Sequence, residues 1–174
     1  QTWKKIIPKT EMLGHALKKM KSLEDETLFT RIKVSLFPDG GLTRLGLYDD
    51  QLPSAEKQQF QDFDKAQSQI FADLIPRALR PMTPKYLSSP QQIIKNWQKL
   101  KAGTEVDIAS LAYGGKIISA TNEHYGPASQ VISPFPPIHM FDGFESARSQ
   151  DKNHFEEIII QLGQSLPLHK IEID

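Results

Sequence analysis

The sequence predicts a mainly β protein in which two β-rich flanks, residues 1–50 and 105–174, are joined by a helical, proline-rich connector, residues 51–104. Short stretches that alternate polar and apolar residues, typical of strands with one buried face, occur in both flanks. In the connector, apolar residues recur at helical spacing instead. Four prolines between residues 76 and 90 exclude one continuous helix there, because an internal proline removes a backbone hydrogen bond.

The first flank contains a predicted hairpin. Residues 31–36 alternate polar and apolar side chains, and the run 38–41, Pro-Asp-Gly-Gly, is a strong turn signal because proline presets φ and glycine accepts positive φ. Residues 44–48 then alternate again, as a returning strand would. We interpret Asp39 as a turn-stabilising residue and Arg44 as a solvated or paired strand residue.

The connector contains two predicted amphipathic helices. Aromatic and aliphatic residues recur at near-helical spacing over residues 60–74. The second helix has a clearer start, since Ser89 can cap it, Pro90 suits its first position and Gln92 completes a capping box. Gly103 can end it. Its apolar face comprises Ile93, Ile94, Trp97 and Leu100. We expect the connector to pack rather than to catalyse.

The second flank returns to β patterns, with predicted strands at residues 116–120, 158–160 and 169–174. A stiff loop is expected at residues 133–137, Ser-Pro-Phe-Pro-Pro.

Composition excludes several classes of protein. Basic and acidic residues both total 21, so no net charge favours nucleic acid or an anionic membrane. No apolar run approaches the roughly 20 residues of a membrane span. The absence of cysteine excludes disulfides and fits a reducing compartment, so we expect a cytoplasmic protein. Because the chain ends inside a strand pattern, we expect it to belong to a longer polypeptide.

The densest group of titratable side chains lies between residues 110 and 149. Carboxylates such as Glu123 and Glu145 can activate water, and His124 can donate a proton. Arg148 can hold a substrate carboxylate through a bidentate pair. The structural alternative is that Asp142 only forms a turn with Gly143 and that Glu145 and Arg148 form a local ion pair.

Other chemistry finds little support in the sequence. Gly114-Gly115 lacks the downstream glycine or lysine of a phosphate-binding loop, and there is no G-x-S-x-G elbow. A metal site from Glu123, His124 and Glu145 is a weak alternative because no known ligand spacing is present. We expect no cofactor and no metal.

Several of these motifs resemble the allantoicase family, the allantoate amidinohydrolases of purine degradation. The run Phe37–Leu45 is similar to the P-D-G-G-x-x-R signature near the end of a family repeat. Residues 114–128 resemble the opening of a repeat, and Asp142–Arg148 resembles the family's D-G-W-E-T-x-R. His154 with the run Ile159–Gly163 follows at the family's spacing. The departures are Phe144, Ser146, Ala147 and Glu157, which replace family residues.

The resemblance implies two repeats, each a galactose-binding-like jelly roll. Residues 1–50 would close a first repeat and residues 105–174 would open a second. Two arrangements are then open: other segments of the same protein complete each half, which we favour, or the two halves join as one permuted jelly roll. A homo-oligomer or an assembly with the remaining segments is expected.

The implied activity is hydrolysis of a carbon–nitrogen bond in a small ureido substrate, allantoate, to ureidoglycolate and urea in allantoin catabolism. From chemistry we assign Glu145 or Glu123 as the general base and His124 as the acid. Arg148 would hold the substrate carboxylate, and Asp142 would orient Arg148 or the backbone turn. Asn122 and Tyr125 are further substrate-binding candidates. A noncatalytic binding module and a related ureido hydrolase are the alternatives.

Overall fold

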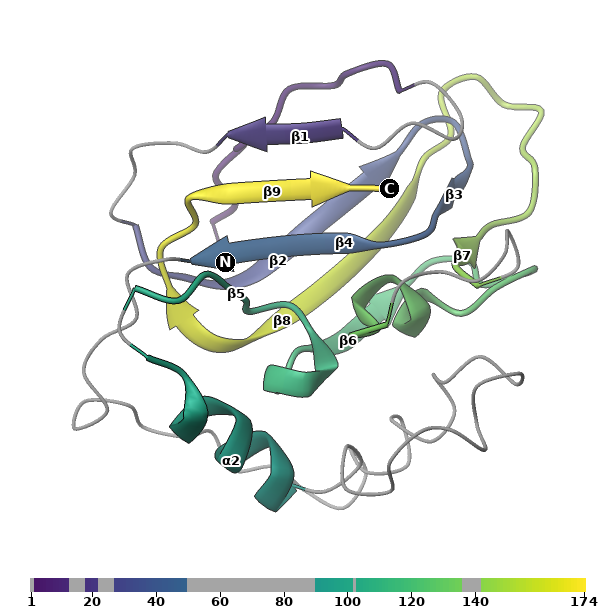
Figure 1. The fold of residues 1–174 in the computed structure, drawn as a ribbon. Helices are drawn as coiled ribbons and strands as arrows, with labels where there is room; N and C mark the ends of the chain where they lie inside the picture. The colour runs from purple at the N-terminus through teal and green to yellow at the C-terminus, as the bar shows by residue number, and fades with distance from the viewer. Residues whose placement is uncertain (1, 13–17, 22–26, 50–89, 102, 136–141) are drawn as a thin grey trace.

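The computed structural model describes residues 2–12, 18–21, 27–49, 90–101, 103–135 and 142–174 (Figure 1). The first predicted helix, residues 60–74, and the Ser89 cap of the second lie outside these ranges. The described chain is mainly β, as predicted, and its strands pair antiparallel. In this part of the chain, no helix is long and apolar enough to cross a membrane.

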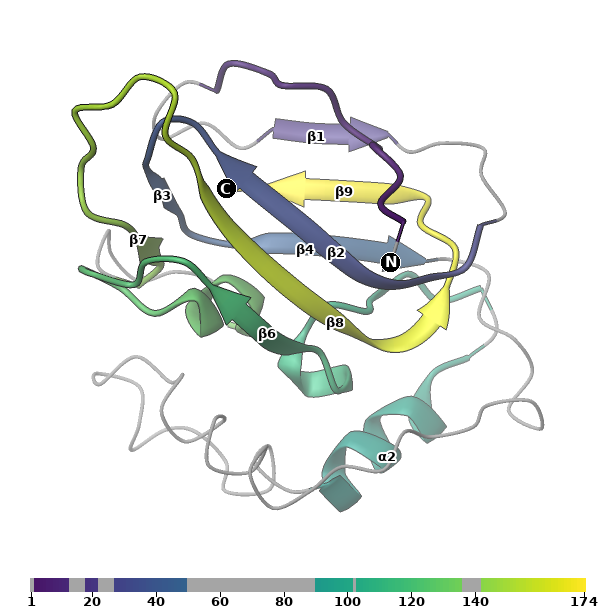
Figure 2. The same cartoon turned by 180° about the vertical axis from the view of Figure 1, so that it is seen from behind.

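Three sheets organise the described residues. The first has the order β1 (Lys18–Lys21), β9 (Lys170–Ile173), β4 (Leu45–Asp49) and β5 (Val106–Asp107). The second has the order β2 (Phe29–Leu36), β8 (Glu156–Leu166) and β6 (Lys116–Ala120). The third pairs β3 (Gly41–Leu42) with β7 (Phe144–Glu145). Figures 1 and 2 show the two larger sheets as two layers.

The two β-rich flanks pair with each other within this chain. In the second sheet, Ile32 of β2 lies opposite Ile160 of β8. In the first, Leu47 of β4 lies opposite Ile171 of β9. Strand edges that would otherwise lack partners in this chain therefore pair with each other. Which segments complete each repeat stays a prediction. The assignment of each flank to a separate repeat, and the jelly-roll connectivity, stay predictions.

One hydrophobic core lies between the two layers. It follows from the period of two in the strands, since Ile158, Ile160 and Leu162 of β8 point to the same buried face. Leu45 and Leu47 of β4 are buried in the same core. The opposite side of β4 therefore carries Gly46 and Tyr48, which line a surface cavity together with Arg44, the residue directly before the strand.

The second connector helix is confirmed as α2 (Pro90–Lys99) and is part of the fold. The Trp97 side chain is only 2% exposed, and its indole Nε1–H donates to the Tyr113 carbonyl at 2.9 Å. The Asn96 amide donates to the Ala112 carbonyl at 2.9 Å. Both carbonyls belong to η4 (Leu111–Tyr113), so α2 docks on that turn. The helix ends at Lys99, and Gly103 takes a positive φ of 78° beyond it.

Candidate functional site

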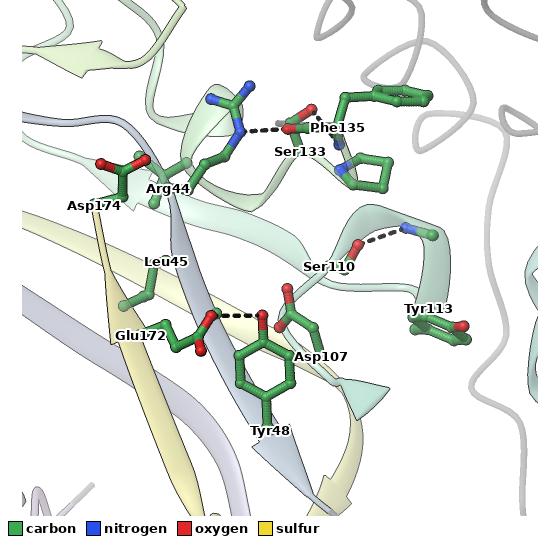
Figure 3. A pocket seen from close by; sticks show the side chains of 14 residues that line it. Arg44, Leu45, Tyr48, Asp107, Ser110, Tyr113, Ser133, Phe135, Glu172 and Asp174 are labelled. Carbon is green, nitrogen blue, oxygen red and sulfur yellow. Dashed lines mark hydrogen bonds between the residues drawn. The ribbon is translucent and has the colours of Figure 1, made fainter. Parts of the chain in front are cut away.

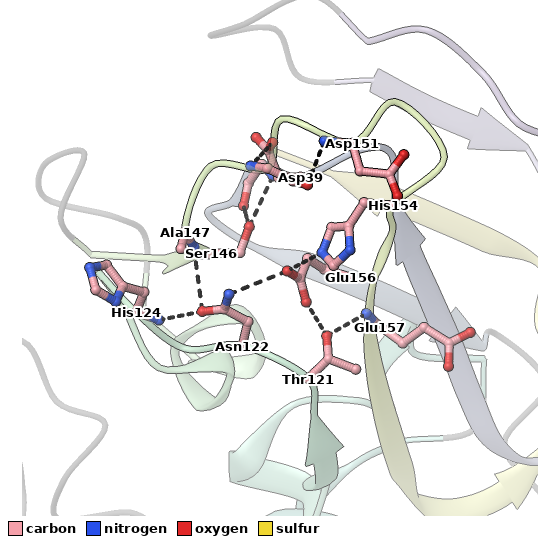
Figure 4. Close-up of polar contacts among 12 residues, drawn as sticks. Asp39, Thr121, Asn122, His124, Ser146, Ala147, Asp151, His154, Glu156 and Glu157 are labelled. Atoms are coloured by element: carbon pink, nitrogen blue, oxygen red, sulfur yellow. Dashed lines mark hydrogen bonds and ion pairs between the residues drawn. The ribbon is translucent and has the colours of Figure 1, made fainter.

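A cavity of about 550 Å³ opens on the outer face of β4 and β9 (Figure 3). Its polar lining includes Arg44, Tyr48, Asp107 and Glu172. None of the seven residues that the sequence predicts for the site is among its lining residues. Two of the seven, Asn122 and His124, lie in the polar cluster around Glu156 at the start of β8 (Figure 4).

The two predicted motifs, residues 121–126 and residues 142–148, lie side by side. The Tyr125 N–H donates to the Glu145 carbonyl at 3.0 Å, and the Glu145 N–H donates to the Gly126 carbonyl at 3.3 Å. A Cβ on Gly126 would lie 2.1 Å from the Gly143 carbonyl oxygen, so only glycine permits this approach. Residues 121–126 and 142–148 therefore form one structural unit.

Glu156 is the centre of the polar contacts. Its side chain is 2% exposed, and its Oε1 accepts from the Asn122 amide at 3.3 Å. The same oxygen lies 2.7 Å from His154 Nε2, and Oε2 accepts from the Thr121 hydroxyl. A buried carboxylate requires such donors, because burial without them is costly. The network extends to the second motif, since Asn122 Oδ1 also accepts from the Ala147 N–H at 3.4 Å.

The surroundings of Glu156 keep it ionised. Burial by itself raises the pKa of Glu156, but hydrogen bonds from His154, Thr121 and Asn122 and the charge of His154 outweigh burial and lower it. An ionised Glu156 requires the proton of the His154 ring on Nε2. When the ring is neutral, His154 Nδ1 is then the acceptor, and the His154 side chain is 40% exposed. The carboxylate thus sets the tautomer of the histidine.

Acid should remove the stabilisation that Glu156 supplies. Because the folded-state pKa lies below the ordinary 4.5, the contribution is present above about pH 4.5 and is lost as pH falls through the folded pKa. We expect the difference in unfolding free energy between the wild type and Glu156→Gln to shrink as the pH is lowered from about 5 to about 2, as measured by urea denaturation. A difference that stays constant over this range would contradict the assignment.

The predicted carboxylates differ in their surroundings. Glu123 Oε1 accepts from the Ala128 N–H at 2.7 Å, at the start of η5 (Ala128–Ile132). Glu145 is exposed on β7, and Arg148 is exposed three residues beyond it. Glu123 therefore stabilises the loop that leads into η5. Glu145 and Arg148, in contrast, are exposed to solvent. Their catalytic roles stay predictions.

The other predicted residues of the first motif lie around the same centre. Both ends of the Asn122 amide contact protein groups, since Oδ1 also accepts from the His124 N–H at 3.1 Å. His124 and Tyr125 are exposed, with ring centroids 4.4 Å apart in an edge-to-face contact. Asn122 thus positions the loop, and Tyr125 and His124 form its exposed rim.

Asp142 forms an ion pair with a residue from the other flank. Its fully buried carboxylate lies 3.2 Å from the Arg44 guanidinium. Arg44 Nε also donates to the Phe135 carbonyl at 2.7 Å. Burial lowers the pKa of Arg44, and the Asp142 carboxylate opposes that effect. Arg44 is paired, as interpreted, and it lies directly before β4, so its pair with Asp142 holds the start of β4 against the second motif. The hairpin predicted from residues 31–36 and 44–48 is wrong, because β2 pairs with β8 in one sheet and β4 pairs with β9 and β5 in another.

Asp39 does more than stabilise its turn. Its Oδ2 accepts from the Ser149 N–H at 2.7 Å, and the neighbouring Gly40 N–H donates to Ser146 Oγ at 3.2 Å. These contacts join residues more than a hundred positions apart. The local interpretation of Asp39 is corrected, because turn statistics do not register a partner so distant in sequence.

Sequence reasoning missed Glu156 and did not assign a role to His154. A signal was present, since Glu156 shares the strand face of Ile158, Ile160 and Leu162, where a carboxylate is out of place. A charged residue on an otherwise apolar strand face indicates that buried polar groups surround it and form hydrogen bonds with it. The described residues contain no group of three His, Cys, Asp or Glu side chains that could hold a metal ion, so they do not assemble the alternative of Glu123, His124 and Glu145.

Comparisons with known proteins place the chain in a family. The family model of the allantoicase repeat matches residues 1–52 and 106–174 and leaves most of the connector unmatched. A protein named probable allantoicase 2 from Burkholderia mallei is 24% identical over 172 residues, and one named probable allantoicase from Photobacterium profundum is 23% identical over 172 residues. Each match covers 99% of this chain but only 38% and 39%, respectively, of the relative. No solved structure matches. By the extent of the family match, the chain belongs to the allantoicase family.

Proposed function

We propose that this chain supplies part of an allantoicase-type hydrolase that converts allantoate and water to ureidoglycolate and urea. Three findings support this: the family membership, the names of the relatives, and the joining of both predicted motifs through Asn122, which also donates to Glu156. Because the chain spans under two-fifths of the relatives it matches, the activity is proposed for the full-length protein.

The reaction needs one proton removed and one supplied. Water adds to the carbon that carries both ureido groups, its C–O bond forms, and one C–N bond breaks. The proton lost by water goes to a base, and the departing urea nitrogen takes up a proton. A side chain that exchanges one proton with solvent or substrate at neutral pH can do both steps.

The His154–Glu156 pair is the observation that carries the proposal. With Nε2 directed to Glu156, Nδ1 of the half-exposed His154 can accept the proton of water, and the ionised Glu156 stabilises the resulting imidazolium. Glu145 is the second candidate base, and it is preferred to Glu123 because Glu123 already accepts from Ala128. Arg148 would anchor the substrate carboxylate.

The test is urea release from allantoate by the full-length protein. We expect His154→Gln to lower kcat by about 100-fold or more, as for loss of a general acid–base group. Glu145→Gln is expected to abolish release if Glu145 is the base, and unchanged turnover removes it from the mechanism. Lys152→Gln, an exposed neighbour of His154, serves as the matched control.

The other functions predict other outcomes. A noncatalytic binding module would bind allantoate but release no urea. A related ureido hydrolase would release product from ureidoglycolate and not from allantoate. Urea release that His154→Gln and Glu145→Gln both leave unchanged would retain the activity but exclude this site.

A further inference from the structure

The cavity on the outer face of β4 and β9 carries polar groups that the proposed reaction does not use. Figure 3 shows Tyr48 of β4 and Glu172 of β9 side by side, with Asp107 of β5 directed toward the same space. The Tyr48 hydroxyl donates to Glu172 Oε2 at 3.1 Å. Tyr113 and Phe135 also line the cavity. Its volume of about 550 Å³ is in the range of small-molecule sites.

Asp107 is a partly buried carboxylate without a cation. Its Oδ1 accepts from the N–H groups of Leu47 and Ala109, each at 3.0 Å. Within the described residues, no Lys, Arg or His forms an ion pair with it, and the nearby charge that acts on it is the acidic Glu172. Burial raises the pKa of Asp107 to about 6, against the lowering effect of the backbone donors, and Glu172 adds to the rise. Buried charges in proteins are normally paired.

The cations near this cavity are already engaged. The Arg44 guanidinium pairs with Asp142 and donates to the Phe135 carbonyl. Lys170 contacts Glu105 and lies 3.4 Å from Glu172, with its ammonium over the Tyr48 ring. Among the described residues, these contacts leave Asp107 as an acid of the lining without an opposite charge. A ligand that enters the cavity would therefore bind more tightly if it carried a positive charge and N–H donors.

We propose that this cavity binds a small organic cation, a guanidinium or an ammonium group, through the carboxylate of Asp107. Glu172 and the hydroxyl of Ser110 are further acceptors in the lining. The ring of Tyr113 adds aromatic surface that favours a cation. The site goes beyond the proposed reaction, whose substrate is an anion and whose proton-transfer residues lie outside this lining.

The experiment is isothermal titration of the full-length protein with methylguanidinium chloride and methylammonium chloride, in buffer that keeps Asp107 ionised and at constant ionic strength. Urea is the neutral isostere of guanidinium, and sodium acetate is the anionic control. We expect at least one of the two cations to bind at least tenfold more tightly than urea and acetate. Urea that binds as tightly as methylguanidinium, or no binding of either cation, overturns the proposal.

Variants locate the site. Asp107→Asn keeps an oxygen that can accept from Leu47 and Ala109, so we expect it to fold and to bind the cation at least tenfold more weakly. Glu172→Gln is the second variant if Asp107→Asn fails to fold, with weaker cation binding expected. Glu11→Gln removes one exposed negative charge that does not line the cavity and should bind as the wild type does. Unchanged binding in a folded Asp107→Asn variant would overturn the assignment.

Discussion

Replacing Trp97 with alanine should lower the free energy of unfolding by about 3–5 kcal/mol, the usual range for a buried tryptophan. The indole is 2% exposed, packs edge-to-face on Tyr113 with centroids 5.2 Å apart, and donates its N–H to the Tyr113 carbonyl. Alanine would leave a cavity under α2 and a carbonyl without its donor. Chemical denaturation followed by circular dichroism measures the loss.

The control for Trp97 is a second substitution at the same position. Trp97→Phe keeps an aromatic ring but cannot donate to Tyr113, so we expect an intermediate loss. Lys95→Ala, a change to an exposed residue of the same helix, should cost under about 0.5 kcal/mol. If Trp97→Ala unfolds at the wild-type denaturant concentration, α2 is not part of the folded unit. The question matters because α2 lies outside the residues that the family model matches.

The second large effect is expected for Gly126→Ala. The new Cβ would lie 2.1 Å from the Gly143 carbonyl oxygen, which belongs to backbone and cannot rotate away. Relief requires residues 121–126 and 142–148 to separate, which breaks the hydrogen bonds that join Gly126 to Glu145. We expect a loss of about 3 kcal/mol or more in unfolding free energy, measured by chemical denaturation, and a fall in urea release, because the two motifs no longer meet.

Gly103→Ala is the control for Gly126→Ala. Gly103 has a positive φ of 78°, but a Cβ added there would meet no atom within 4 Å, so the cost is limited to backbone strain of about 1 kcal/mol. It lies in the connector, away from both motifs in sequence. A Gly126→Ala variant with wild-type stability and wild-type activity would show that the close approach is not required.

Much of the fold could be predicted because it depends on local patterns. The alternation in residues 31–36 predicts β2, and Pro90 with Gln92 predicts the start of α2. The partner of each strand could not be predicted in this way. Alternation identifies a buried face but not the strand that covers it, so β2 could equally have paired outside this chain. The pairing of β2 with β8 is a long-range contact that only the folded chain shows.

For the candidate site, too, some features follow from the sequence and others only from the tertiary structure. The sequence alone determined the class of protein, the two motifs and the chemistry available to their carboxylates, histidine and arginine, because residue types and spacing carry that information. The tertiary structure decided the partners: Asp142 with Arg44, Asp39 with Ser149, and Glu156 with Asn122 and His154. The physical reason is that burial and hydrogen bonding set the role of a titratable group, and both depend on residues far apart in the chain.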